Sequence, residues 1–419
     1  MKKYILNIAI VLLALVSFNS CSDDDDKGGS GGGTPVVRYI RPCDATISDS
    51  LLTSGYLGTQ IAIIGENLSK VNKVYFNDQK AKLNPNFVTD NTIIVNIPSG
   101  IPGEKQDLIK LYTNNDSCYY TFETKVPAPA PKSMTCEYVD DGNVAYIHGL
   151  YFIHEDANPL TVTFEGGLQG EVVSHDLDNI AVKVPVGAKP GPVKVTSVYG
   201  TTESPFYFRD YRNIILDFDT KFADGGYHHG WHAGSGYSTD GGLTGCGQYL
   251  IFTGEMDDDK WDDSKFGYER WTYRTTDPDF FDAGALDKYV LKFEVNIPDV
   301  WSAAALQIIF TGASDVWMNW QEGGSTGGNP NNAYLSNSNY PRALWIPWAD
   351  TGTYVSNGWV TVTIPMTDFK YSKDGTNLNK VNAAGHYSGI TLFVNGGGVT
   401  GTPCNPTFHI DNVRVVKAQ

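Results

Sequence analysis

The feature that most constrains the fold is an internal repeat. The run NTIIVNIPSGIPG at 91–103 returns as NIAVKVPVGAKPG at 179–191, and IIG at 63–65 returns as IHG at 147–149. The copies are therefore 84 to 88 positions apart. A unit of that length can bury a small core of its own, whereas the units of most solenoids are shorter. The repeat predicts two tandem domains.

Both units show the pattern of β-sandwiches. Short runs that alternate apolar and polar residues, such as 61–64, 73–76 and 92–97, are separated by turn residues. A content of 44 glycines and 12% aromatic residues also favours an all-β chain. We place the two domains at 36–125 and 126–209. The proline-rich run VPAPAP at their junction predicts a stiff, extended hinge.

The first copy carries a family resemblance. IAIIGENL at 61–68, followed by VYF at 74–76 and a strand that ends at Pro98, resembles the IPT/TIG immunoglobulin-like domain. The second copy has HGLYF at 148–152 in place of GENL and matches mainly through its later strands. The resemblance implies two immunoglobulin-like spacers. A binding face of their own is the alternative.

A third domain is expected at 210–419. It opens with NIILDFD at 213–219 and closes with TFHIDNVRVV at 407–416, and short strands and Gly-rich loops recur between them. About 210 residues of this kind fit a β-jelly roll. The fold class that we predict is therefore all-β, with two tandem immunoglobulin-like (IPT/TIG) sandwiches followed by a C-terminal jelly roll.

The N-terminus predicts export. Lys2 and Lys3 precede an apolar run, 5–16, that is too short to span a membrane and is typical of a signal peptide. Cys21 follows closely, so residues 1–21 are read as a lipoprotein signal with a lipidated Cys21. An ordinary secretory signal is the alternative. Residues 22–35 form an acidic and Gly/Ser tether that cannot bury a core. The acidic run resembles the signal that sends lipoproteins of Bacteroidetes-type bacteria to the exterior face of the outer membrane.

All nine tryptophans lie between Trp231 and Trp359, inside the third domain. Indole rings offer flat apolar surfaces on which sugar rings can stack. Two stretches, VWMNWQ at 316–321 and RALWIPWAD at 342–350, place two tryptophans three apart among planar polar side chains. The predicted glycan-binding residues are Trp317, Asn319, Trp320, Gln321, Arg342, Trp345, Trp348 and Trp271.

Residues three apart on a strand point to opposite faces, so one tryptophan of each pair can belong to the core. Trp317 shares a face with Asn319 and Gln321 and is the favoured ligand platform, whereas Trp320 is favoured for the core. Trp348 is expected in the loop after the strand. Trp301 and Trp359 are expected in the core.

Metal binding has two candidate sites. His228, His229 and His232 have no local Cys or carboxylate to complete a transition-metal set. Asp217, Asp219 and Asp411 lie on the first and last strands of the third domain, and their hard oxygen ligands suit a structural calcium ion. Salt-bridged or solvated carboxylates are the alternative. No other cofactor is expected.

The five cysteines after Cys21 show no zinc spacing. Pairs such as Cys43 with Cys118, or Cys246 with Cys404, would each staple one domain, but the sequence does not assign them.

The order of the parts resembles Bacteroidetes surface glycan-binding lipoproteins. The strand GWVTVTIP at 358–365 and the closing strand are similar to those of carbohydrate-binding jelly rolls. The resemblance implies non-catalytic binding of a β-glucan or xyloglucan-like polysaccharide, with a SusC/SusD-like transport pair as partner. A net charge of −16 argues against nucleic acid.

Two other functions remain as alternatives. EMDDDK at 255–260 resembles the E-x-D-x-x-E motif of jelly-roll glucanases only in its first two acids, because Lys260 replaces the second catalytic carboxylate. A surface adhesin that binds protein through its immunoglobulin-like domains would leave the tryptophans unexplained.

Overall fold

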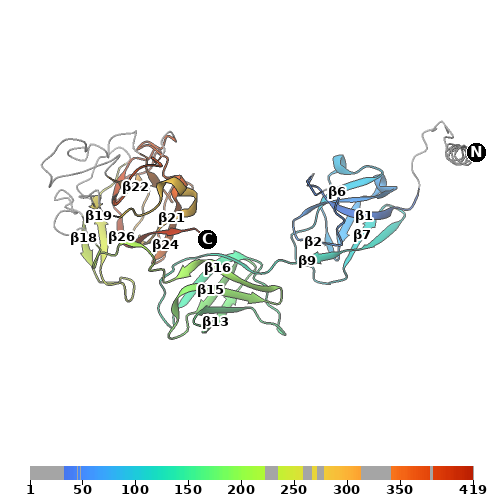
Figure 1. Ribbon diagram of the computed structural model, residues 1–419, viewed down its shortest axis with the longest axis horizontal. Coiled ribbons are helices and arrows are strands. Elements are labelled where there is room, and N and C mark those ends of the chain that lie inside the picture. The colour runs from blue at the N-terminus through green and yellow to red at the C-terminus, as the bar shows by residue number, and fades with distance from the viewer. Residues whose placement is uncertain are drawn as a thin grey trace, which may run out of the picture. The chain divides into compact units, whose positions relative to one another are not determined.

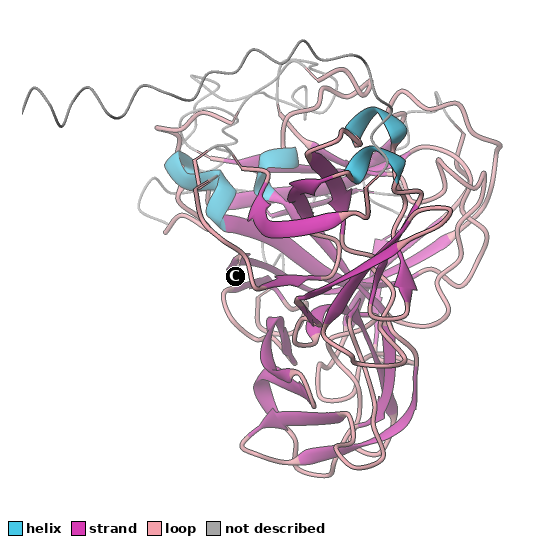
Figure 2. Cartoon of the chain, turned by 90° about the vertical axis from the view of Figure 1, so that its right-hand side faces the viewer, coloured by secondary structure: helices cyan, strands magenta, loops and turns pink. Residues whose placement is uncertain are grey.

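The computed structural model describes residues 33–44, 46–47, 49–221, 235–257, 267–270, 278–312, 341–377 and 381–418. In these ranges the chain is built almost wholly of β-strands, as predicted, with a few short 3-10 helices between them (Figure 2). We call residues 36–125 domain 1, residues 130–208 domain 2 and residues 214–417 domain 3, because each β-sheet lies within one of these ranges.

Domain 1 is a sandwich whose core lies between two antiparallel sheets. Strands such as β7 alternate buried and half-buried residues, which is why one face of each sheet packs inward. One sheet is ordered β1 (Val36–Pro42), β3 (Gln60–Glu66), β6 (Thr92–Asn96), and the other β5 (Gln79–Lys80), β4 (Lys73–Phe76), β7 (Leu108–Tyr112), β8 (Ser117–Thr121). The short strands β2 (Ser54–Tyr56) and β9 (Glu123–Lys125) pair in parallel, and the helices are η1 (Leu68–Lys70) and η2 (Pro85–Phe87).

Domain 2 forms a single antiparallel sheet, of which Figure 1 labels β13, β15 and β16. The strand order is β10 (Ala130–Met134), β11 (Val144–Leu150), β14 (Asn179–Lys183), β13 (Gln169–His175), β12 (Thr161–Glu165), β15 (Lys189–Ser197), β16 (Gly200–Phe208). Contact between β10 and β16 closes the sheet around a core that includes Ile147, Val162 and Phe208. Closure leaves few unpaired strand edges exposed.

The same structural reason requires glycine at the repeated position in both domains. Gly65 on β3 pairs with Val37 beside a bulge in β1, and Gly149 on β11 pairs with Pro131 beside a bulge in β10. A Cβ at Gly65 would lie 1.9 Å from the Val36 carbonyl oxygen, and one at Gly149 would lie 2.3 Å from that of Ala130. The neighbouring backbone therefore leaves no room for a side chain at either position.

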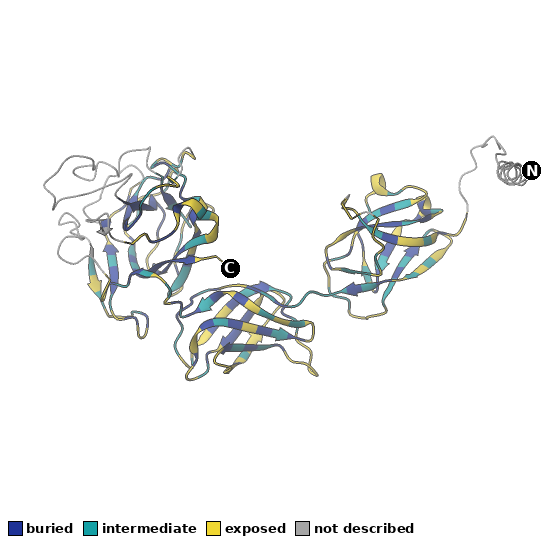
Figure 3. Ribbon diagram, in the orientation of Figure 1, coloured by how far each residue is buried: buried dark blue, intermediate teal, exposed yellow. Residues whose placement is uncertain are grey.

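Domain 3 is a two-sheet jelly roll around the largest core of the chain. One sheet is ordered β18 (Ser235–Ser238), β19 (Tyr249–Thr253), β26 (Thr407–Lys417), β21 (Tyr289–Asn296), β24 (Val360–Pro365), with β17 (Ile214–Leu216) also on β26; the other is ordered β20 (Gly267–Arg270), β25 (Gly389–Asn395), β22 (Ala305–Thr311), β23 (Ala343–Trp345). The helices are η3 (Ala283–Lys288) and η5 (Met366–Asp368). Figure 3 shows in dark blue the buried residues, which include most of β21, β22 and β26.

The chain divides into two compact units at Pro127, so domains 2 and 3 belong to one unit. The border falls in the proline-rich segment for which a hinge was predicted. Inside the second unit, Glu137 of the segment after β10 reaches into domain 3. Its carboxylate accepts a 2.6 Å hydrogen bond from Arg414 and also pairs with Lys292. Arg414 pairs in turn with Glu294 at 2.7 Å, and all four side chains are buried.

No helix in the described ranges is long and apolar enough to cross a membrane. The five described cysteines are unpaired, so neither of the disulfides considered from the sequence is formed in this structure.

Candidate functional site

The four-stranded sheet of domain 3 carries polar and aromatic side chains on the face that points away from the core. Along β22, Leu306, Ile308 and Phe310 enter the core, so Gln307 and Thr311 lie on the opposite face. Along β25 the same alternation places Thr391 and Phe393 on that face. We call this set, together with Arg342 next to β23, the outer face. All five side chains are buried.

Gln307 organises the outer face. Its Oε1 accepts a 2.8 Å hydrogen bond from Nη1 of Arg342, and its Nε2 donates to the carbonyl oxygens of Lys373 and Asn395 at 3.1 and 3.0 Å. The Arg342 guanidinium carbon lies 5.9 Å from the centre of the Phe393 ring. A buried amide and guanidinium need such partners to offset the cost of leaving water. Gln307, Arg342 and Phe393 therefore form a fixed polar and aromatic layer, but their burial leaves them no free surface on which a sugar ring could stack.

The structure corrects the prediction for two of the described candidates. Arg342 is fully buried and hydrogen-bonded to Gln307, so it orders the outer face from within rather than presenting a free guanidinium. Trp348 follows β23 in a turn, as expected, but only 2% of its surface is exposed. Its Nε1 donates to the Ala304 carbonyl oxygen at 2.9 Å. Trp348 is thus a core residue, because tertiary packing rather than loop position decides its burial.

Trp345 is half-buried at the end of β23 and packs on the core side, with its ring centre 5.4 Å from that of Trp301 and 5.8 Å from that of Tyr354. It belongs to an aromatic cluster around the fully buried Trp301, whose core position was predicted. Trp345 keeps some exposed surface, but its contacts place it with the core and not with the outer face.

The remaining predicted glycan contacts lie outside the described residues. They are Trp271, Trp317, Asn319, Trp320 and Gln321, and the histidine group at 228–232 lies outside them as well. Their roles stay predictions.

The outer face contains residues that the sequence analysis missed, above all Gln307, Thr391 and Phe393. A signal was present, because Gln307 is the one polar residue in the run AAALQIIF at 303–310. A polar residue in such a run requires a buried partner. The identity of that partner, Arg342, depends on the pairing of β22 with β23.

The predicted calcium ligands do not form a ligand set. Within the ranges that the structure describes, no group of three or more His, Cys, Asp or Glu side chains is arranged to hold a metal ion. Asp217 instead accepts backbone hydrogen bonds from Asp219, Thr220 and Lys221, and Asp219 accepts one from Gln248 at 3.0 Å. These carboxylates shape the turn after β17.

Asp411 is buried on β26, and its Oδ2 atom has no hydrogen-bond partner among the described residues. Burial raises the pKa of Asp411 to about 8, and the nearby carboxylates of Glu294, Asp219 and Asp217 add to the rise. The side chain is therefore largely protonated at neutral pH, because a second negative charge next to Glu294 would have no cation of its own.

Asp411→Asn is expected to flatten the pH dependence of stability. The unfolded carboxyl releases its proton near pH 4 and the folded one near pH 8, so the wild-type protein loses stability as pH rises through that window. The neutral amide removes this loss and should raise the free energy of unfolding at pH 8 by about 1 to 3 kcal/mol. Urea unfolding at pH 5 and pH 8 measures the difference.

Asp217→Asn is the matched control. Burial opposes ionisation of Asp217, but hydrogen bonds from Lys221 and Thr220 prevail and lower its pKa. The ionised Asp217 carboxylate therefore stabilises the fold at pH values above the usual pKa of a carboxyl group. Removing it should lower the free energy of unfolding at neutral pH. Equal slopes in Asp411→Asn and wild type would contradict the buried, protonated state of Asp411.

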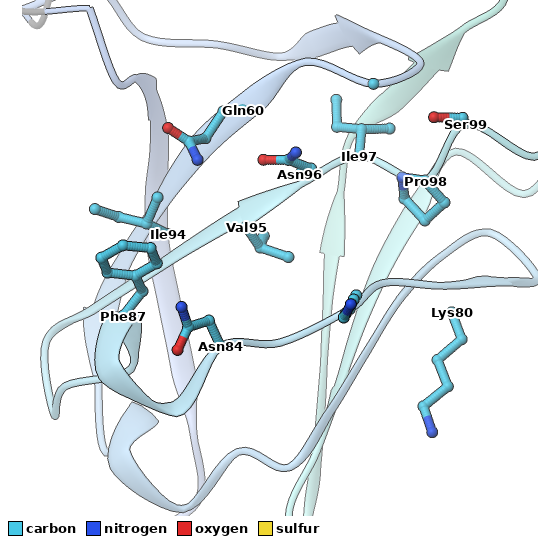
Figure 4. Close-up of a pocket in the computed structure, with 12 residues that line it drawn as sticks. Gln60, Lys80, Asn84, Phe87, Ile94, Val95, Asn96, Ile97, Pro98 and Ser99 are labelled. Carbon is cyan, nitrogen blue, oxygen red and sulfur yellow. The ribbon is translucent and has the colours of Figure 1, made fainter. Parts of the chain in front are cut away.

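A groove of about 490 Å³ lies on domain 1. Figure 4 shows the amides of Gln60, Asn84 and Asn96 around it, with the exposed Phe87 ring at one end. Lys80 and Lys82 also line it. One phenylalanine offers less stacking surface than the tryptophan-rich domain 3, so we do not place the main site here.

Two family models match parts of the chain. Residues 208–417 match the surface glycan-binding protein B xyloglucan binding domain, and residues 45–123 match the IPT/TIG domain. The first match spans domain 3 and therefore contains the outer face.

Two known proteins are similar, one over nearly the whole chain and the other over about a third of it. The crystal structure of the surface glycan-binding protein PbSGBP-B from Prevotella bryantii is 30% identical in sequence, covers 93% of this chain and 100% of its own, and has a TM-score of 0.69. An IPT/TIG domain-containing protein from Bacteroides ovatus is 32% identical over 136 residues, which are 31% of this chain. The matched stretch spans only 27% of that relative's length.

Proposed function

Because the chain belongs to the surface glycan-binding protein B family, we propose that domain 3 binds a β-linked polysaccharide of the xyloglucan or β-glucan type without cleaving it. The observation that carries the proposal is the match of residues 208–417 to a xyloglucan-binding domain. Gln307, Arg342 and Phe393 are buried, so they would support such a site from beneath rather than contact the sugar.

The proposal places the protein on the cell exterior. A lipidated Cys21 would hold it to the outer membrane, and the tether and domain 1 would separate domain 3 from the lipid surface. A SusC/SusD-like transport pair would then receive the captured polysaccharide. The acidic net charge of −16 fits a neutral ligand.

A non-catalytic role is part of the same proposal. Glu255 and Asp257, the two acids of the glucanase-like run, are exposed after β19, and the sequence puts Lys260 where a second catalytic carboxylate would stand. A retaining glycosidase needs two carboxyl groups at a fixed separation, and a lysine cannot replace one of them.

The direct test is isothermal titration of a soluble form that begins after Cys21 against xyloglucan, mixed-linkage glucan, laminarin, mannan and galactan. Products of the same mixtures are analysed by chromatography. We expect saturable binding of one β-glucan class and no new reducing ends. Cleavage of any of the five glycans would contradict the proposed non-catalytic binding and identify the protein as an enzyme.

Trp317→Ala is expected to weaken that binding by about tenfold or more, because a stacked indole contributes on the order of 1 to 3 kcal/mol when it is buried by a ligand. Trp320→Ala should instead lower thermal stability, as its predicted core position requires. Tyr119→Ala, an exposed position on β8 of domain 1, serves as the control. Equal affinities for Trp317→Ala and Tyr119→Ala would remove Trp317 from the site.

A further inference from the structure

A cleft of about 480 Å³ lies between domains 2 and 3, inside the compact unit that they share. Domain 2 contributes Asn143 and Tyr146, and domain 3 contributes Leu243, Asn357 and Trp359. Trp359 directly precedes β24, which is an edge strand of the six-stranded sheet. The cleft is therefore distinct from the outer face, which belongs to the other sheet.

Two aromatic rings give the cleft its apolar surface. Tyr146 points out of β11 with 51% of its surface exposed. Trp359, which was expected in the core, is instead half-buried; its Nε1 donates to the Gly241 carbonyl oxygen at 2.9 Å, and its ring lies edge-on to Tyr249 at 5.3 Å. Because its polar atom is already paired and its ring is fixed, Trp359 can offer the cleft only an apolar surface.

The polar lining consists mainly of uncharged side chains. The carboxamides of Asn143 and Asn357 form no hydrogen bond with other described side chains, and they can donate and accept at the same time. The charged residue of the lining is Asp140, which accepts a 2.8 Å hydrogen bond from the Thr244 hydroxyl. None of the described lining residues is a lysine or an arginine. An anionic ligand would therefore meet no cation here, whereas a neutral polyhydroxyl ligand would be well matched.

The walls of the cleft are held together by hydrogen bonds that cross between the domains. The Thr361 amide of domain 3 donates to the Thr135 carbonyl oxygen of domain 2 at 2.8 Å, and within domain 2 the Thr135 amide donates to the Tyr146 carbonyl oxygen at 3.0 Å. The Glu137 amide donates to the Thr361 hydroxyl at 2.8 Å. The buried pair of Glu137 with Arg414 lies on the same segment. A cleft fixed in this way loses little conformational entropy when a ligand enters.

We propose that this cleft is a second glycan-binding site, which takes a short segment of a neutral polysaccharide by stacking on Tyr146 and Trp359 and by hydrogen bonding to Asn143 and Asn357. Its volume lies within the roughly 300 to 1,000 Å³ of small-molecule sites. The inference rests on the proposed function for the choice of ligand. Occupation of both sites by one polymer would raise the apparent affinity for long chains over that for short ones.

The test follows Trp359 directly, by fluorine NMR of the soluble protein labelled with 5-fluorotryptophan. Trp359→Phe assigns the resonance. Titration with xyloglucan oligosaccharides, and with mixed-linkage glucan oligosaccharides in a second series, should shift the Trp359 signal in a saturable way. The shift should persist in Trp317→Ala, since Trp317 is a predicted contact of the main site and is not among the residues that line the cleft.

Tyr146 supplies the matched variants. Tyr146→Ala should weaken the cleft interaction roughly threefold to tenfold and leave the oligosaccharide affinity of the main site unchanged, whereas Tyr146→Phe keeps the ring and should stay within about twofold of wild type. Tyr119→Ala on domain 1 is the control for loss of an exposed tyrosine.

The outcomes separate this inference from the proposed function. If calorimetry shows glycan binding but the Trp359 signal does not move, the second site is wrong and the main proposal stands. If Tyr146→Ala leaves the Trp359 shift intact, the cleft is also ruled out as a stacking site. If no glycan binds by either method, the proposed function fails, and the choice of a glycan for the cleft fails with it.

Discussion

Replacing Arg414 by methionine is expected to destabilise the second unit by about 3 to 5 kcal/mol, because it removes the cation of a buried charge network. Arg414 pairs with Glu294 at 2.7 Å and with Glu137 at 2.6 Å, and its side chain is fully buried. Methionine fills a similar volume but leaves the Glu294 carboxylate without a cation. Glu137 retains Lys292. Urea unfolding at neutral pH measures the loss.

The same substitution should uncouple domains 2 and 3. Glu137 belongs to domain 2's side of the junction, whereas Arg414, Glu294 and Lys292 belong to domain 3. We therefore expect the transition of the second unit to broaden or to split in calorimetry. Lys194→Ala is the control, since Lys194 and Glu203 are both half exposed at 3.7 Å and such pairs contribute little. A stability loss no larger than that of Lys194→Ala would contradict the role given to the network.

Trp348→Ala should be the second most damaging change, with a loss of about 3 to 5 kcal/mol in the free energy of unfolding. The indole is 2% exposed in the main core, so alanine leaves a cavity. It also leaves the Ala304 carbonyl oxygen without the indole Nε1 donor. Ala304 has a left-handed backbone with φ of 61°, and Trp301 holds the adjacent Ala303 carbonyl oxygen in the same way. Thermal unfolding of the soluble protein measures the effect.

Glycan binding separates the two roles that Trp348 could have. Below the unfolding temperature of Trp348→Ala, its affinity for the best glycan should stay within about twofold of wild type, because a core residue acts through stability. Trp348→Phe, which refills part of the cavity, should recover a share of the stability. Normal stability with lost glycan affinity would return Trp348 to the binding site.

The repeat, the alternation of apolar residues and the turn glycines were sufficient to predict an all-β chain with two immunoglobulin-like domains and a jelly roll. Gly65 and Gly149 illustrate the repeat, since each lies on a strand that a neighbouring strand of the same domain approaches too closely for a side chain. The family resemblance to surface glycan-binding proteins also rested on local motifs and their order. Such features are encoded by residues that lie near one another in the sequence.

The candidate site was less predictable. Two tryptophans three residues apart on a strand point to opposite faces, but this spacing does not say which of the two faces is buried. Trp345 and Trp348 both turned out to contact the core, and Arg342 bonded to Gln307, which lies 35 positions earlier. Each of these outcomes depends on which strand β23 pairs with.

What the sequence determined by itself is thus the type of each domain and the concentration of aromatic residues in the last one, because propensity and periodicity act over a few residues. The tertiary structure decided which of those aromatics lie in the core and which hydrogen bonds connect the residues of the outer face. It also decided that domains 2 and 3 form one unit around Glu137 and Arg414, which are 277 positions apart. Burial and charge pairing depend on which distant segments meet, and local sequence patterns do not specify that choice.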